Sequence, residues 1–342
     1  DRRQRQMCIR DRCKTTIGFN LLKENIEGST YEYKTLDQEV ATVAKDGTVT
    51  ATGIGTTYIK VHDTKTDIWN AVRVNVNGAE NKTQPKVVGG GHHYVALKGN
   101  GTVYTWGYNG SGQLGLGDTN NRTEPTQTNM KAVIDIAAGT DHTLVLKADG
   151  TVWTWGYNGY GQLGLGDNSN RYRPTQINIE NVVDIAAGNN HALLVTADGK
   201  VYSFGSNSYG QLGRTGNTYT PQEIPNLENI EKVSAGNYHS MAIDKEGNVY
   251  TWGYNQNGQL GDGTRISNSI PTKIKLTNIT KIATKNNTSA AIDGDGNLYT
   301  WGYNSYGQQG ISIDNIYTPR KVPTLEPVSY THLRAHETRR HL

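Results

Sequence analysis

The chain has 342 residues, and its composition argues against membrane-spanning and nucleic-acid-binding proteins. Only 35% of the residues are hydrophobic, whereas 40 are Gly and 20 are Tyr, a profile typical of short strands joined by tight turns. No apolar run approaches the ~18 residues of a membrane-spanning helix. The net charge of +3 resides in the two ends, because residues 15–326 carry only about −3, which gives no electrostatic reason to bind nucleic acid.

The two ends differ in composition from the rest of the chain. Residues 1–14 carry a net charge of +4, and residues 327–342 carry +2. The stretches MCIRDR and VSYTHLRAHET resemble translated sequencing-adapter sequence, so we expect both ends to be non-native, with basic disordered tails as the alternative. Both cysteines, Cys8 and Cys13, lie in the first end, so the body relies on neither disulfides nor thiolate metal ligands.

Residues 15–78 predict a small β-sandwich. Alternating apolar and polar residues predict strands at 40–43, 48–51, 56–61 and 71–76. Asp46 and Gly47, between the first two runs, predict a hairpin with a type I′ turn. Several short strands at this spacing are typical of two packed sheets.

This segment resembles the group 2 bacterial immunoglobulin-like domain. The resemblance rests on Val40 to Val43, Asp46-Gly47-Thr48-Val49, the run ATGIGT at 51–56 and the closing strand at 72–76. It implies a spacer or adhesion module of a bacterial protein located outside the cytoplasm. The family's first strands are poorly represented here, which leaves open a sandwich that is truncated at its front. Residues 79–85 then form a predicted polar linker.

A repeat of 48 or 49 residues follows the linker. The block Trp106-Gly107-Tyr108-Asn109, followed by Gly112-Gln113-Leu114-Gly115, recurs almost unchanged. The aromatic residue that opens each block is Trp106, Trp155, Phe204, Trp252 or Trp301. A regular period near 50 residues in a β-type pattern predicts a repeat architecture. Recurring residues are expected to build its scaffold, and residues that differ between units are expected to carry specific function.

Each unit is predicted to contain four short strands. In the second unit we expect strands at 133–138, 142–147 and 151–155, and a long Gly- and Asn-rich loop at 156–173 that leads to the segment Pro174 to Ile177. Four-stranded units of this kind are the blades of a β-propeller. The third strand alternates large and small side chains, so each large ring, which buries ~150–250 Å², is expected to pack against a neighbouring blade.

The repeat resembles the regulator of chromosome condensation repeat. The resemblance is carried by Ala138-Gly139-Thr140-Asp141-His142, Asp149-Gly150-Thr151-Val152, Trp155-Gly156-Tyr157-Asn158 and Gly161-Gln162-Leu163-Gly164. Five copies cover residues 86–326, whereas the family's propeller has seven blades. The implied fold class is all-β: a small immunoglobulin-like β-sandwich followed by five four-stranded blades of an incomplete ring. A natural five-bladed ring is the alternative.

The fifth copy departs from the pattern. Lys285 and Thr288 stand at its Gly and His positions, and Gln309 stands at its Leu position. We interpret this copy as a degenerate or terminal blade, which is common in repeat arrays.

Four histidines share one repeat position: His93, His142, His191 and His239. A ring of metal ligands is one interpretation, but ligands must lie ~2 Å from the ion, and equivalent positions on separate blades should lie too far apart. The favoured interpretation is one structural His per blade, hydrogen-bonded to a local backbone group.

Other patterns predict no catalytic or cofactor site. The Gly-x-x-Gly pairs neither open a helix nor precede Lys-Ser/Thr, so we expect them to permit positive φ rather than to bind phosphate. Asp118, Asp167 and Asp262 fit no EF-hand spacing and are interpreted as solvated turn residues, with bound calcium as the alternative. No Ser-His-Asp, Cys-His or paired-carboxylate pattern stands out. We therefore expect no enzyme activity, no cofactor and no metal.

The candidate partner-binding residues vary within the repeated loop: Ser111, Tyr160, Tyr209, Asn257 and Tyr306. Tyr, Asn and Ser on a rigid frame suit the recognition of a protein surface, although drift of polar loops is the alternative for any single residue. The hypothesis is a non-enzymatic module of a secreted or surface bacterial protein, which binds a protein or cell-surface ligand through variable loops on one face of the propeller.

Two other functions stay open on these patterns. The family resemblance implies a regulator similar to guanine-nucleotide exchange factors, but the constant period leaves no room for a long insertion and the body is not basic. The second is an extracellular enzyme that acts on glycans or peptides.

The binding hypothesis has a parallel within the family. Secreted bacterial members that inhibit β-lactamases bind their target with loops on one face, a mode that the Tyr variation fits.

Overall fold

The computed structural model describes residues 6–9, 15–16, 30–36, 38, 41–45, 48–51, 55–76, 83–311 and 314–323. The regular elements of these residues are all β-strands, which confirms the all-β prediction. None of them forms a helix with the length and hydropathy that crossing a bilayer requires. Four predicted features lie outside the described residues: the end at 327–342, most of the end at 1–14, the Asp46-Gly47 turn and residues 79–82 of the linker.

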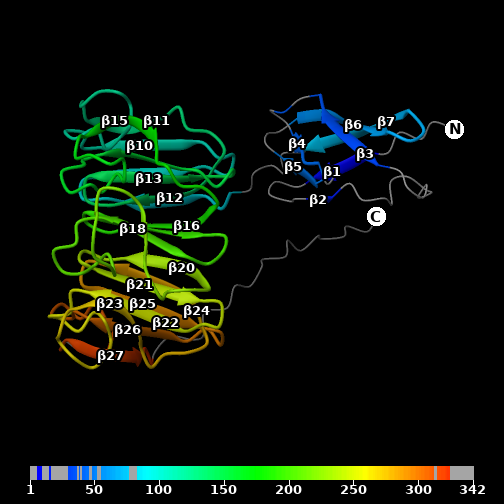
Figure 1. Ribbon diagram of the computed structural model, residues 1–342. Helices are drawn as coiled ribbons and strands as arrows, with labels where there is room; N and C mark the ends of the chain where they lie inside the picture. The colour runs from blue at the N-terminus through cyan, green and yellow to red at the C-terminus, as the bar shows by residue number, and fades with distance from the viewer. Residues whose placement is uncertain are drawn as a thin grey trace, which may run out of the picture.

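The strands before residue 77 form two small sheets (Figure 1). One has the strand order β1-β7-β6-β3, and the other has the order β2-β5-β4. The bounds are β1 Gln6–Ile9, β2 Thr15–Thr16, β3 Tyr31–Thr35, β4 Ala41–Val43, β5 Thr48–Ala51, β6 Gly55–Asp63 and β7 Ile68–Val76. Strand β1 pairs with β7 in parallel, whereas the other described pairs are antiparallel. Ala41 and Val49 on one sheet and Ile59 and Val61 on the other are buried, as two sheets with one apolar face each require.

Residues 86–321 form five four-stranded sheets whose strands follow the order of the chain. The first sheet consists of β8 Lys86–Gly89, β9 His93–Leu97, β10 Val103–Gly107 and β11 Arg122–Gln127. The second consists of β12 Val133–Ala138, β13 His142–Lys147, β14 Val152–Gly156 and β15 Arg171–Gln176. The third consists of β16 Val182–Ala187, β17 His191–Thr196, β18 Val201–Gly205 and β19 Gln222–Glu223. The fourth consists of β20 Ile230–Ala235, β21 His239–Asp244, β22 Val249–Gly253 and β23 Asn268–Lys273, and the fifth of β24 Ile279–Lys285, β25 Thr288–Asp293, β26 Leu298–Gly302 and β27 Ile316–Lys321.

The observed strands follow the predicted repeat closely. In the second sheet, β12 and β13 have the predicted bounds, and β14 is shifted by one residue. Strand β15 begins at Arg171, inside the predicted loop, because Arg171 pairs with Gly156. Pro174 lies in this strand and has no N–H to donate, which suits an outer edge. Prolines at the same place in β11, β23 and β27 follow the same rule.

Neighbouring sheets pack face to face along the chain (Figure 1). Trp155 of the second sheet is fully buried against Val95 and Leu97 of the first. Its indole Nε1 donates a 2.9 Å hydrogen bond to the carbonyl oxygen of Gln113, in the loop between β10 and β11 of the first sheet. The equivalent rings at later junctions are likewise fully buried: Phe204, Trp252 and Trp301. Each junction thus buries an aromatic ring that one sheet alone would leave exposed to water.

The first and fifth sheets each leave one face partly exposed. Every residue of β17 and β21 is buried, so both faces of the third and fourth sheets are covered. In β25 burial alternates instead, with Ser289, Ala291 and Asp293 buried but the residues between them only half-buried. Trp106 of the first sheet is half-buried and stacks on the exposed ring of Tyr94 at 5.5 Å. Trp106 therefore departs from the expectation that a neighbouring sheet buries each ring, because among the described residues no sheet of the repeat precedes the first one.

Candidate functional site

One end of the propeller collects most of the variable residues. In the second sheet, His142 pairs with Gly156, so the turn before β13 and the loop after β14 lie at the same end. The backbone N–H of Tyr157 donates to the carbonyl oxygen of Asp141 at 2.8 Å and holds this loop against this turn. The same bond recurs in the other sheets, for example from Tyr254 to Tyr238 at 2.8 Å. We call the surface made by these turns and loops (89–92 and 107–121 in the first sheet, and their equivalents) the loop face.

The repeated Asn and Gln residues hold each loop in one conformation. Asn158 is buried, accepts a 2.9 Å hydrogen bond from the backbone N–H of Leu163 and donates to the carbonyl oxygen of Asp167. Gln162 accepts a 2.9 Å bond from the backbone N–H of Tyr160. Gly161, with φ of 76°, occupies a backbone region that favours glycine. The Trp-Gly-Tyr-Asn and Gly-Gln-Leu-Gly blocks are therefore a frame that presents the residues between them.

The predicted partner-binding residues all lie at one place in this frame. Each donates its backbone N–H to a Gln side chain two residues later, at 2.9 or 3.0 Å: Ser111, Tyr160, Tyr209, Asn257 and Tyr306. Their side chains differ in exposure. The tyrosines are 50%, 45% and 87% exposed in chain order, whereas Ser111 and Asn257 are half-buried. The frame thus brings three large rings to solvent on one face.

Tyrosines from neighbouring turns extend this surface, and sequence reasoning missed them. The ring of Tyr209 lies 5.0 Å from that of Tyr238 and 4.9 Å from that of Tyr254. Tyr238 belongs to the turn before β21, where the repeat also varies, and that variation was the available signal. Tyr160 similarly meets Tyr157 at 6.2 Å. The contacts of Tyr209 join the loop of the third sheet to the turn and the loop of the fourth and support its exposed ring from two sides, whereas Tyr157 and Tyr160 lie in one loop.

The four repeat histidines lie inside the propeller, away from solvent. Burial is the main cause that lowers the pKa of His93 to about 4 and that of His142, His191 and His239 to about 3, so these rings are neutral at pH 7. Among the described residues, no group of three or more His, Cys, Asp or Glu side chains could hold a metal ion.

The hydrogen-bond partners of these histidines differ from the expected local backbone group. The Nε2 atom of His93 lies 3.1 Å from Thr143 Oγ1 in the next sheet. Two later histidines make the same contact at 3.0 and 2.9 Å, His191 to Ser240 and His239 to Ser289. The histidines therefore link adjacent sheets rather than only stabilising their own turn.

The acidic loop residues are paired with basic and amide groups. Asp118 Oδ2 accepts a 2.7 Å hydrogen bond from Arg122, and this bond is the main cause that lowers the pKa of Asp118. Asp167 and Arg171 repeat the pair at 2.6 Å. These two carboxylates thus close their own loop while staying 36% and 43% exposed, and an arginine four residues later was the signal that sequence reasoning missed. Asp262 has no such arginine and accepts hydrogen bonds from the backbone N–H and the hydroxyl of Thr264 instead, both at 2.8 Å.

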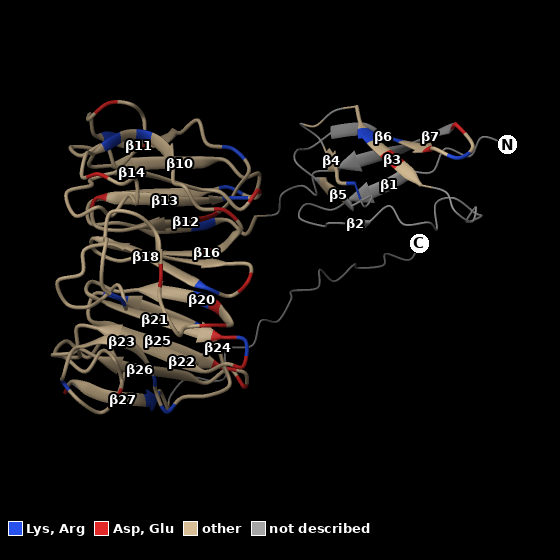
Figure 2. Ribbon diagram, in the orientation of Figure 1, with Lys and Arg blue, Asp and Glu red and all other residues tan. Residues whose placement is uncertain are grey.

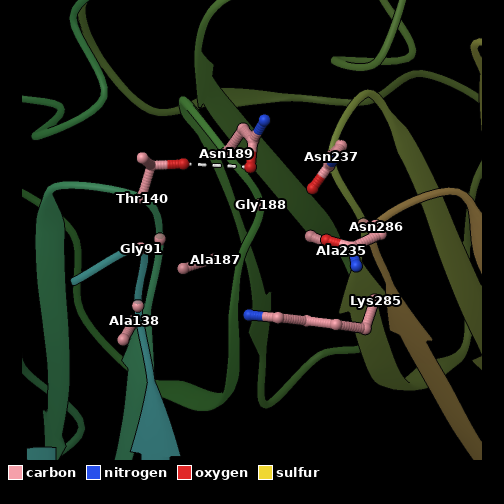
Figure 3. Close-up of a pocket in the computed structure, with 13 residues that line it drawn as sticks. Gly91, Ala138, Thr140, Ala187, Gly188, Asn189, Ala235, Asn237, Lys285 and Asn286 are labelled. Carbon is pink, nitrogen blue, oxygen red and sulfur yellow. Dashed lines mark hydrogen bonds between the residues drawn. The ribbon is translucent and has the colours of Figure 1, made fainter. Parts of the chain in front are cut away.

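A pocket lies on the axis of the propeller, where the turns of all five sheets meet (Figure 3). It encloses about 200 Å³ and is lined mainly by glycine, alanine and asparagine, with one ammonium group, that of Lys285. Hydrogen bonds join the turns around the pocket, from Gly91 N to Thr140 O at 2.8 Å and from Thr140 N to Asn189 O at 3.1 Å. Around the sheets, acidic and basic residues are interspersed (Figure 2).

Comparisons with known proteins agree with this architecture. Residues 26–283 match the sequence model of the RCC1-like domain. Residues 279–308 and 295–332 match models of the regulator of chromosome condensation (RCC1) repeat.

Two solved structures and one curated protein are similar to the chain. Human WBSCR16 has 23% identity and a TM-score of 0.63, with 79% of each chain covered. Prp20p from Saccharomyces cerevisiae, described with its binding to Gsp1p and histones, has 20% identity and a TM-score of 0.62, with 87% of this chain and 86% of that chain covered. These likenesses show the fold alone. A stretch of 37 residues, 11% of this chain, is 60% identical to the E3 ubiquitin-protein ligase MYCBP2 of Danio rerio, of whose length the chain spans 1%.

Proposed function

The chain belongs to the RCC1-like domain family, and we propose that its β-propeller is a non-enzymatic module that binds a protein or cell-surface ligand through the loop face. The observation that carries the proposal is the exposure of Tyr160, Tyr209 and Tyr306 at one variable position of an otherwise constant frame. Ser111 and Asn257 complete that position in the two remaining sheets.

The chemistry of this surface supports protein recognition. A tyrosine offers a large amphipathic contact area and loses little conformational entropy on binding, because only two side-chain torsions must be fixed. The rings of Tyr238 and Tyr254 already restrict Tyr209 in the free protein. Such residues are the usual anchors of protein interfaces. The solved Prp20p structure, described with binding to Gsp1p and histones, is a protein-binding example on the same fold.

The setting that we propose is a secreted or surface protein of a bacterium. Strand order before residue 77 supports it. The sheets β7-β6-β3 and β2-β5-β4 match the C-F-G and B-E-D strand orders of an immunoglobulin-like sandwich when β2 to β7 are taken as strands B to G. We therefore assign residues 15–78 to an immunoglobulin-like spacer, although the RCC1-like match begins at residue 26.

We further propose that the five sheets are blades of an incomplete ring. The half-buried face of β25 and the half-buried Trp106 support this, since both would be covered by an additional blade. In the alternative, a closed five-bladed ring, the exposed faces of the first and fifth sheets would pack against each other and both would be buried.

A site-specific photo-crosslinking experiment tests the binding proposal. A photoreactive phenylalanine analogue replaces Tyr209 in one variant and Lys245 in another. Lys245 is exposed and lies in the turn after β21, at the opposite end of the fourth sheet. Both variants are irradiated in extract of the source material.

We expect a discrete adduct from position 209 only. Excess unlabelled protein should compete for this adduct, whereas the Tyr160→Ala/Tyr209→Ala variant should not. Identical adducts from position 245, or full competition by the double variant, would exclude the loop face as the binding surface.

A further inference from the structure

In the fifth sheet, two residues of the repeated turn change together. At Gly139, Gly188 and Gly236, an added Cβ atom would lie only 2.0 to 2.2 Å from Cε1 of the histidine three residues later. The imidazole therefore requires glycine at this position. The fifth sheet has Thr288 in place of that histidine, and the missing ring leaves room for a side chain at position 285, which is Lys.

Lys285 reaches across the axis of the propeller. Its Nζ donates a 3.1 Å hydrogen bond to the carbonyl oxygen of Gly89 in the first sheet, 196 residues earlier in the chain. Figure 3 shows the side chain extended from β24 across the pocket, with its nitrogen toward the turns that carry Gly91 and Ala138. An ammonium group has three N–H donors, so two remain after the bond to Gly89.

The electrostatics of the axial pocket favour an anion. Among the described residues, its lining contains the ammonium of Lys285 and no Asp or Glu. His93 adds no second charge at pH 7, because burial and repulsion by Lys285 lower its pKa to about 4. The one positive charge of this lining thus faces a polar, half-enclosed space in which its field is screened less than in bulk water.

Neutral polar side chains also line the pocket. Asn189 Oδ1 accepts a 2.9 Å hydrogen bond from the Thr140 hydroxyl, which leaves the Asn189 amide nitrogen as a donor. Asn237 and Asn286 also line the pocket (Figure 3). The lining therefore offers one charged donor, with the polar side chains of three asparagines around it.

We propose that the axial pocket binds a small ligand through a carboxylate group, with Lys285 as the charged contact. A carboxylate accepts up to about four hydrogen bonds, and those from a cationic donor are roughly twice as strong as neutral ones. The cavity of about 200 Å³ exceeds the ~30 Å³ of one water but falls below the ~300 Å³ at which drug-sized pockets begin. The ligand is accordingly a short-chain acid. The turns that line the pocket belong to the loop face, but the charged contact is Lys285 and none of the exposed tyrosines, so this proposal does not depend on their role.

Titration with sodium malonate tests the proposal on the full chain. Heat of binding and backbone amide shifts are recorded against sodium chloride of equal ionic strength and against glycerol. Lys285→Met removes the charge, Lys285→Arg keeps it, and Lys245→Met makes the same change at the far end of the fourth sheet.

We expect saturable binding of malonate with a dissociation constant of ~1 mM, as for a weak contact with one anion, and amide shifts at Gly91, Gly139 and Gly188. Lys285→Met should weaken it ~10-fold or more, whereas Lys285→Arg and Lys245→Met should bind as the parent does. Circular dichroism checks that each variant folds. Equal binding by the parent and Lys285→Met, equal weakening by Lys245→Met, or no saturable binding to the parent would each overturn the proposal.

Discussion

The imidazole Nε2 of His191 lies 3.0 Å from the hydroxyl oxygen of Ser240 in the next sheet. That hydroxyl donates in turn to the carbonyl oxygen of Gln211 at 2.8 Å, and the indole of Trp252 donates to the same carbonyl at 2.9 Å. Ser240 and Trp252 are cross-strand partners. A buried network therefore joins the first residue of β17 and the loop of the third sheet to the two central strands of the fourth.

One junction lacks this network. Between the second and third sheets, Ala192 and Phe204 occupy the places of Ser240 and Trp252, and neither side chain can donate a hydrogen bond. His142 is consequently buried with no hydrogen-bond partner on either ring nitrogen among the described residues. Burying an unpaired polar atom costs roughly 1–3 kcal/mol, so this junction should be the least stable of the four.

Ala192→Ser should stabilise the protein by about 0.5–1.5 kcal/mol, because the new hydroxyl meets His142 Nε2 as Ser240 meets His191. The matched control is Ser240→Ala, which removes an existing partner and should cost about 1–3 kcal/mol. Urea unfolding followed by tryptophan fluorescence measures both. A loss of stability in both variants would mean that His142 occupies a site without room for the hydroxyl.

Acid should unfold the propeller through its buried histidines. Their folded pKa values, about 4 for His93 and about 3 for the other three, lie below the ordinary 6.5, so the unfolded chain binds more protons below pH 6.5. Their stabilising contribution is complete above pH 6.5 and is lost as the pH falls toward the folded values. Each contributes a slope of ~1.4 kcal/mol per pH unit.

Four such slopes would remove a typical stability of ~5–15 kcal/mol within about one to three pH units below 6.5. We therefore expect an unfolding midpoint between about pH 4 and 5.5, measured by tryptophan fluorescence and by proton uptake. His142→Leu removes one titrating group without losing a hydrogen bond and should lower the midpoint. A midpoint below about pH 3 in the parent would contradict neutral, buried histidines.

Asp184→Asn should stabilise the protein more at pH 7.5 than at pH 5. Burial raises the pKa of Asp184 from 3.8 to about 6, against the opposing effects of Lys232 and of the Val233 N–H at 2.8 Å. The Asp184 carboxyl thus holds its proton more tightly in the folded than in the unfolded state. The stability that this proton confers is complete below about pH 4 and is lost as the pH rises through 6.

Asp184→Asn should therefore raise the free energy of unfolding by about 1–3 kcal/mol at pH 7.5, and by about 1 kcal/mol less at pH 5. Urea unfolding at the two pH values measures the difference. Asp135→Asn is the matched control, because Asp135 holds the same place in the second sheet but is 23% rather than 11% exposed and pairs more closely with its lysine, Lys86 at 2.6 Å against Lys232 at 3.4 Å. It should gain nothing. A gain at Asp184 that does not change with pH would show that the carboxyl is not the source.

Trp252→Phe and Trp106→Phe should differ in cost. Trp252 is fully buried and donates its indole N–H to Gln211, so its replacement should cost about 1–2 kcal/mol. Trp106 is half-buried on Tyr94, and its replacement should cost less than about 0.5 kcal/mol. Thermal unfolding compares the two. Equal costs would mean that a further element covers Trp106 in solution.

Tyr160→Ala/Tyr209→Ala should leave the fold intact. Both rings are about half exposed, so their truncation should cost less than about 1 kcal/mol in all. Thermal unfolding of the double variant measures this. Cooperative unfolding at a nearly unchanged temperature is expected if the two rings belong to a recognition surface. Loss of the folded state would assign the rings to the core instead.

Local chemistry makes the repeat visible in the amino-acid sequence. The alternation of apolar residues in 133–138 and 142–147 predicted two strands whose observed bounds are the same. The Gly-Gln-Leu-Gly block marked a loop that positive-φ glycines close, as Gly161 and Gly164 do. These signals lie within one blade, where residues that interact are near one another in the chain, and so the sequence carries them directly.

Other features depend on how the blades meet. The sequence placed His142 and His191 at one position, but only stacking decided that Ser240 partners the second while Ala192 leaves the first unpaired. The same holds for the contact between Lys285 and Gly89. The sequence by itself determined the blade and its repetition, because strand pattern and turn chemistry act over a few residues. Only the tertiary structure decided the hydroxyl partners of the histidines, the two half-covered faces and the charge in the axial pocket, because each arises where segments about 50 to 200 residues apart are brought into contact.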